Sequence, residues 1–92
     1  MDKMEKLTLM DKILRELDDL KNSQTSVLKK LAQIEADNIN LGVALLDKKL
    51  PDLHEEVDSS VEIVTALTDE FKEHRDKFFN DNNLGEQQNP TA

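Results

Sequence analysis

The stretch Met10–Leu45 reads MDKILRELDDLKNSQTSVLKKLAQIEADNINLGVAL and carries a seven-residue repeat over five consecutive heptads. Apolar residues occupy nine of eleven repeat positions, the 3.5-residue period at which long helices pack along one another. A further column, Leu7, Leu14 and Leu28, lies beside these positions and widens the apolar stripe. The eleven positions form the predicted oligomerisation seam: Met10, Ile13, Leu17, Leu20, Gln24, Val27, Leu31, Ile34, Asn38, Leu41 and Leu45.

Two segments could interrupt this helix. Residues 22–26 are polar and form helices weakly, but the repeat passes through them without a change of phase, which favours one continuous helix over a loop. Pro51 is the stronger interruption, because proline lacks a backbone donor and clashes with the preceding turn. The sequence therefore predicts helices over about residues 3–48 and 52–80 with a break near Pro51, where the chain either kinks or reverses.

The second helix has its own apolar positions. We expect these positions to form the second-helix core: Leu53, Val57, Val64, Leu67, Phe71 and Phe78. Both helices are expected to belong to a single helical domain, residues 1–83. Residues 84–92 consist mainly of Gly, Gln, Asn, Pro and Thr, a composition that predicts a disordered tail. The expected fold class is all-α, with long amphipathic helices in a coiled-coil or helical-bundle homo-oligomer.

Composition supports self-association. A chain of 92 residues with three Phe, no Trp and no Tyr can build only a thin core as a monomer. Copies of the same chain could cover the leucine stripe, and Leu and Ile at alternating repeat positions favour a tetramer or a dimer of dimers over a simple dimer. Asn38 is expected to fix the register of this assembly as a buried amide.

The net charge of −8 limits the classes of partner. Residues 1–50 contain nine basic and nine acidic residues, whereas residues 51–92 contain three basic and eleven acidic residues. An acidic half repels phosphate backbones, so nucleic acid is not an expected partner. The charged start shows no signal peptide and no run is long enough to span a membrane, so we expect a cytoplasmic protein whose membrane contact, if any, is made through a partner.

The chain offers little for catalysis. It has no Cys and two His, and His54 and His74 lie among carboxylates that are expected to be solvated surface residues. Metal sites need three or four converging ligands, and nucleophilic catalysis needs a base beside the nucleophile. We expect no catalytic residues, no cofactor and no metal site, and hence a non-enzyme.

The run Ile13–Gln24, ILRELDDLKNSQ, is typical of short coiled-coil proteins of bacteria and phages. Over Met4–Leu53, and in length and composition, the chain resembles the small accessory proteins encoded beside a holin in Borrelia prophages, of the haemolysin accessory type. The resemblance implies a helical, oligomeric, non-catalytic protein that assists a small membrane-active lysis protein, and it carries over no functional residues.

Two alternatives stay open. The chain could be a coiled-coil scaffold of a phage or bacterium. It is also similar in length to secreted type VII helical hairpins, which turn near mid-chain, where this sequence has Asn40-Leu41-Gly42. Against that similarity, the chain lacks the expected Trp and a Tyr-based C-terminal signal, and its heptads continue through the supposed turn.

Overall fold

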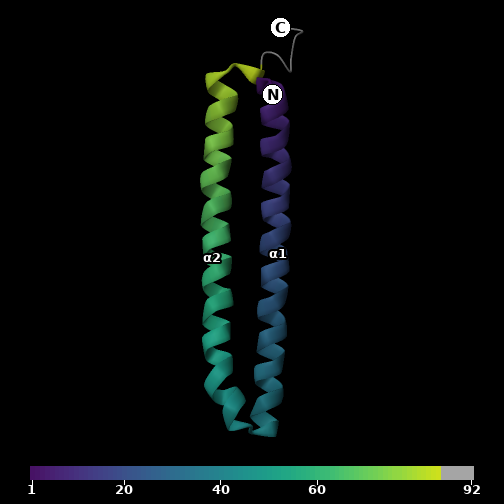
Figure 1. Cartoon of the computed structure of the whole chain (residues 1–92), viewed down its shortest axis with the longest axis vertical. Coiled ribbons are helices and arrows are strands. Elements are labelled where there is room, and N and C mark those ends of the chain that lie inside the picture. The colour runs from purple at the N-terminus through teal and green to yellow at the C-terminus, as the bar shows by residue number, and fades with distance from the viewer. Residues whose placement is uncertain (86–92) are drawn as a thin grey trace.

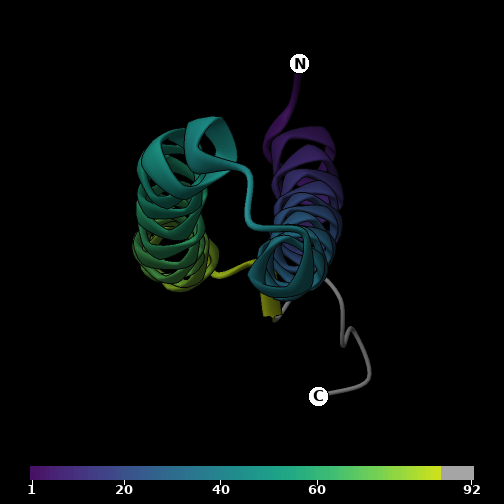
Figure 2. The ribbon, with the colours of Figure 1, turned by 90° about the horizontal axis from the view of Figure 1, so that it is seen from below.

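The computed structural model describes residues 1–85 and consists of two long helices, α1 (Lys3–Leu41) and α2 (Ala44–Asp81). The helices run antiparallel along each other as a hairpin, so the start of α1 and the end of α2 lie at the same end of the molecule (Figures 1 and 2). The molecule measures 67 × 21 × 17 Å. The predicted all-α fold is confirmed, with no strand in the described part of the chain.

α1 begins and continues as its sequence predicts. Asp2 caps its N-terminus, because the side-chain oxygen Oδ1 accepts a hydrogen bond of 2.7 Å from the backbone N–H of Glu5. The helix passes through residues 22–26 without interruption, which confirms that this polar stretch is not a loop.

The chain reverses at Gly42 and Val43, and this corrects the predicted break near Pro51. Gly42 has φ +71°, a left-handed conformation that glycine adopts without strain, and its N–H donates to the carbonyl of Asn38. The first helix therefore ends at Leu41 rather than near residue 48, and the second begins at Ala44 rather than near residue 52.

Pro51 lies inside α2. It removes the hydrogen bond that a residue at this position would donate to the carbonyl of Asp47, and its ring crowds the preceding turn. Figure 1 shows the first turns of α2 inclined toward α1 relative to the rest of the helix, the bend expected around a proline. The helix continues past Pro51 because residues before and after the bend both pack against α1.

The side chains between the helices follow a heptad repeat, but one shifted from the predicted seam. In α1 most of the buried and half-buried positions alternate between two columns: Leu7, Leu14, Lys21, Leu28 and Glu35 in one, and Met10, Leu17, Gln24, Leu31 and Asn38 in the other. α2 has two corresponding columns. One contains Leu50, Val57, Val64, Phe71 and Phe78, and the other contains His54, Val61, Thr68 and Arg75. The hairpin core is thin, since only Leu7, Leu31, Val64 and Leu84 are buried apolar residues in the described part.

Leu84 corrects the expected start of the disordered tail. Asn83 has φ +53° and turns the chain after α2, and Leu84 is fully buried at the end of the molecule where α1 begins. Figure 1 shows the chain crossing from α2 to the start of α1 at this end. The remaining residues of the expected tail, 86–92, lie outside the described part of the chain.

Candidate functional site

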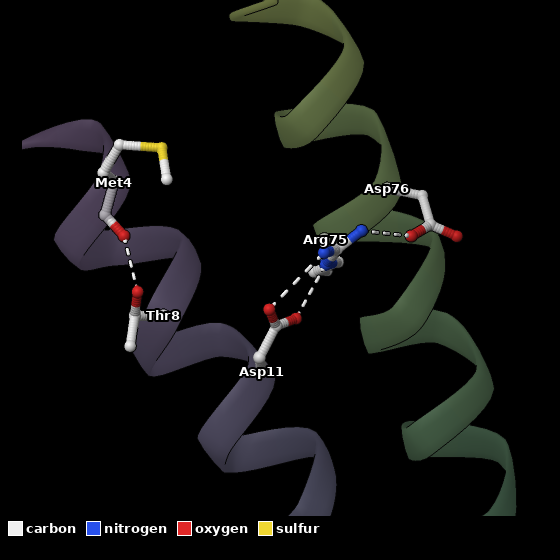
Figure 3. A network of polar contacts seen from close by, with 5 residues as sticks. All are labelled: Met4, Thr8, Asp11, Arg75 and Asp76. Atoms are coloured by element: carbon white, nitrogen blue, oxygen red, sulfur yellow. Dashed lines mark hydrogen bonds and ion pairs between the residues drawn. The ribbon is translucent and has the colours of Figure 1, made fainter. Parts of the chain in front are cut away.

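The two sides of the hairpin differ in chemistry. We call one the ionic side, because both ion pairs that join α1 to α2 within residues 1–85 lie on it. The guanidinium of Arg75 donates from Nε to Asp11 Oδ1 at 2.8 Å and from Nη2 to Asp11 Oδ2 at 3.4 Å (Figure 3). Arg75 also pairs with Asp76 and lies over the ring of Phe79 at 5.0 Å from its centroid. These contacts hold the pKa of Arg75 above its ordinary value, chiefly through the hydrogen bond to Asp11.

The second ion pair of the ionic side joins His54 to Glu35. The distance from His54 Nδ1 to Glu35 Oε1 is 2.5 Å, and both side chains remain partly exposed. The pKa of His54 is raised, first by the hydrogen bond to Glu35 and then by the negative charge of that carboxylate, with a smaller contribution from Asp58. The pair therefore gains strength when the imidazole is protonated.

The other side of the hairpin carries an apolar surface that nothing in the described chain covers. In α1 it follows a column at seven-residue spacing, Ile13, Leu20, Val27 and Ile34, and in α2 it includes Leu53 and Leu67. We call these six residues the apolar face. Each is between 38% and 50% exposed, so each touches the hairpin core with part of its side chain and presents the rest to solvent.

The middle of the apolar face contains a polar layer. Gln24 Nε2 donates to Ser60 Oγ at 2.5 Å, and both residues line a shallow depression together with Val27, Glu56 and Val57. This shared depression shows that the α1 and α2 columns lie on the same side of the hairpin. Gln24 Oε1 is buried and has no hydrogen-bond partner within residues 1–85.

A second exposed apolar surface lies at the turn. Ile39, Leu41 and Leu45 are 81%, 68% and 64% exposed, and Val43 is 37% exposed. We call residues 39–45 the hairpin tip. No charged residue occurs between Asp37 and Asp47, so the end of a strongly charged rod is itself uncharged.

Asn38 holds the tip in place. It is 3% exposed, and its Nδ2 donates to Asp47 Oδ1 at 2.7 Å and to the carbonyl of Val43 at 3.3 Å. Its Oδ1 accepts the N–H of Val43 at 3.0 Å. In the hairpin the partners of this buried amide belong to the turn of the same chain, and its expected role in the register of an oligomer stays a prediction.

The structure divides the predicted seam. Met10, Leu17, Gln24, Leu31 and Asn38 face α2, whereas the other positions are exposed: Ile13, Leu20, Val27, Ile34, Leu41 and Leu45. Of the predicted second-helix core, Val57, Val64, Phe71 and Phe78 face α1, while Leu53 and Leu67 are exposed on the apolar face. Contact of the exposed residues with another copy stays a prediction.

The sequence interpretation missed the residues that close the ionic side. Arg75 and His54 repeat at seven-residue spacing with Val61 and Thr68, so extending the heptad count through α2 could have placed them at the contact with α1. The spacing of Asp11 and Arg15, four residues apart with the acid first, is typical of a pair within one helix, but Asp11 pairs with Arg75. Nothing in the local sequence indicates that choice.

Neither metal binding nor a membrane span is indicated by the described residues. Within residues 1–85 no three His, Cys, Asp or Glu side chains lie where they could hold a metal ion together. Neither α1 nor α2 combines the length and apolar character needed to cross a bilayer.

Comparison of the chain with models of protein families, with curated proteins and with solved structures finds no match. Architecture and surface chemistry therefore define the class: an all-α, two-helix hairpin of the coiled-coil type, with one ionic side, one apolar face and an apolar tip.

Proposed function

We propose that this chain is a non-catalytic, oligomeric accessory protein that binds a small membrane-active protein of a prophage lysis system through its hairpin tip. One observation carries the proposal: three of the five most exposed large apolar side chains within residues 1–85, Ile39, Leu41 and Leu45, lie at one end of a charged rod, the other two being Met1 and Ile63. Isolated exposed apolar residues are ordinary, but a group of this kind at a turn is typical of a binding surface.

The shape of the molecule supports a partner at or in a membrane. The tip lies at the end of a body 67 Å long, so it can contact a small apolar partner while both helices remain in water. Such an arrangement needs no membrane span in this chain. The resemblance to prophage accessory proteins supplies the class of partner, a holin-like protein.

A photo-crosslinking experiment tests this function. The chain is co-expressed with a holin-like membrane protein, with a photo-reactive amino acid at Leu41 or, as the matched control, at Gln33 on the exposed outer surface of α1. We expect crosslinks to the membrane protein from position 41 and none from position 33. Crosslinks confined to copies of this chain, with the membrane protein present in the same extract, would contradict the proposal.

The hairpin itself favours one alternative, a secreted helical hairpin of the type VII kind. The chain reverses at Gly42 and Val43, close to mid-chain, where proteins of that class are expected to turn. The absence of Trp still argues against it. Secretion into the medium that depends on a type VII apparatus would favour this alternative over the accessory role.

A further inference from the structure

We propose that a second copy of this chain covers the apolar face, so that two hairpins form a four-helix bundle whose tips remain free. The proposal deepens the oligomeric part of the proposed function by naming the surface that joins the copies. In the apolar face each column lies three residues beyond a column that already packs within the hairpin, as in Leu17 and Leu20 of α1. In α1 this column is a third apolar column beside the two that face α2, and a helix with so wide an apolar stripe can pack against two neighbours, as a helix in a four-helix bundle does.

The size of the apolar face suits a dimer. Its α1 column extends from Ile13 to Ile34, a length of about 32 Å at 1.5 Å per residue, and the hairpin is 21 Å wide. A stable interface buries about 800 Å² on each partner. A strip of this length and width, with its protruding side chains, has a surface area of that order.

The charges around the apolar face favour a copy of the same chain. Three residues beyond the six residues of the apolar face lie exposed rim positions: Glu16, Ser23, Lys30, Asp37, Glu56 and Glu70. On α2 the same rim column also contains Lys49, Ile63 and Lys77, which are likewise exposed. Counted with Lys49 and Lys77, the rim carries four carboxylates and three lysines, so it is close to neutral although the whole chain has a net charge of −8. Because α1 and α2 each contribute both signs, Lys30 of one copy can face a glutamate on α2 of the other.

The opposite side of the hairpin is unsuited to the same contact. On this side, the positions that flank the hairpin core are charged where the apolar face has aliphatic residues. They include Asp11 and Asp18 on α1, and Asp58 and Lys72 on α2. Burying these charges against another copy would cost several kcal/mol for each unpaired charge, on the order estimated for buried ions. The dimer contact therefore belongs on the apolar face alone.

The polar layer of Gln24 and Ser60 marks the middle of the apolar face. Gln24 lies midway between Ile13 and Ile34, and Ser60 lies midway between Leu53 and Leu67. A two-fold axis through the middle of the apolar face therefore brings this polar layer against its own copy, whichever way the two hairpins point.

Sedimentation equilibrium of the full chain tests the dimer. We expect a mass twice 10.5 kDa for the wild type. Leu20→Glu with Val27→Glu should weaken the dimer by about 100-fold or more, since four carboxylates would enter the centre of the interface. Helix content in circular dichroism should be retained, because both side chains are partly exposed in the single hairpin. The matched control, Ser26→Glu with Gln33→Glu, adds the same charges to the outer surface of α1 and should leave the dimer intact.

A photo-crosslinker at position 20 keeps the test decisive if the double variant fails to fold. In the otherwise unchanged protein it should crosslink to residues 13–34 or 53–67 of a second copy, whereas position 33 should not. A wild-type monomer at micromolar concentration, a double variant that remains dimeric, or position-20 crosslinks confined to one chain would each overturn the proposal. None of these outcomes affects whether the tip binds a membrane protein, so failure here and failure of the proposed function can be told apart.

Discussion

Asn38 determines the geometry of the turn at the level of a single residue. Its amide makes three hydrogen bonds, to both backbone polar groups of Val43 and to the carboxylate of Asp47, and it is almost fully buried. A buried polar group with satisfied partners stabilises one conformation, and removal of the side chain leaves those partners without it. Asn38 thereby joins the last turn of α1 to the first turn of α2.

We predict that Asn38→Ala lowers the free energy of unfolding by about 1–3 kcal/mol, the range for leaving buried hydrogen-bonding groups unpaired. Urea denaturation followed by circular dichroism measures the change. Asn40→Ala, at an exposed position two residues along, is the control and should have little effect. Equal losses in the two variants would show that helix propensity, rather than the hydrogen bonds at the turn, determines the cost.

The pair of His54 and Glu35 makes stability depend on pH. Because the pKa of His54 is raised in the folded chain, the pair stabilises the hairpin fully below the unfolded pKa of about 6.5 and loses this contribution as the pH rises through the higher folded value. We predict that Glu35→Gln lowers the pKa of the His54 imidazole in an NMR titration. The difference in melting temperature between wild type and Glu35→Gln should be larger at about pH 6 than at about pH 9.

Glu62→Gln is the control for this titration, because it removes a carboxylate from an exposed position two turns away on α2. The imidazole of His54 should titrate in this variant as it does in the wild type. If Glu35→Gln leaves the titration unchanged while Glu62→Gln shifts it, the general negative charge of α2 rather than the pair would raise the pKa.

At the scale of the element, α2 contains a proline, Pro51, at which the sequence predicts a break between helices. Pro51 removes one backbone hydrogen bond, at a typical cost of about 3 kcal/mol. The 38-residue helix retains its other hydrogen bonds and its contacts with α1 on both sides of the bend. A single interruption is therefore outweighed by packing along the length of the hairpin.

We predict that Pro51→Ala raises the free energy of unfolding by about 2 kcal/mol, because a donor returns to the carbonyl of Asp47 and only part of the gain is offset by the freer unfolded chain. Thermal melts at one protein concentration measure the change, and Asp52→Ala is the exposed neighbouring control. A lower melting temperature for Pro51→Ala would instead show that the bend is needed to bring the first turns of α2 against the tip.

At the scale of the whole molecule, the ionic side and the apolar face give the rod two unlike flanks. The Asp11–Arg75 and Glu35–His54 pairs close one flank, while the apolar face leaves the other able to pack. This asymmetry follows from three neighbouring apolar columns in α1, of which a single hairpin partner can cover only two. In the proposed dimer the third column is covered by the second copy, and the apolar tip remains at the end of the bundle.

The sequence by itself determined that the chain is helical and where its apolar columns lie. Helix formation follows from a local pattern: the 3.5-residue period, the Asp2 cap and the unbroken phase through residues 22–26 are all readable without knowledge of distant contacts. The same pattern cannot identify the partner of each column, because a heptad repeat packs equally well against another part of its own chain or against another chain.

Only the tertiary structure decided where the chain reverses and which columns are covered. Gly42 is tolerated inside helices as well as at their ends, and Asn38 is compatible with both a coiled-coil seam and a turn, so neither residue alone predicts a reversal. Once α2 returns along α1, its position selects the columns of Leu7 and Met10 for the core and leaves the column of Ile13 exposed. The pairing of Asp11 with Arg75, 64 residues apart, exists only because the hairpin brings them together.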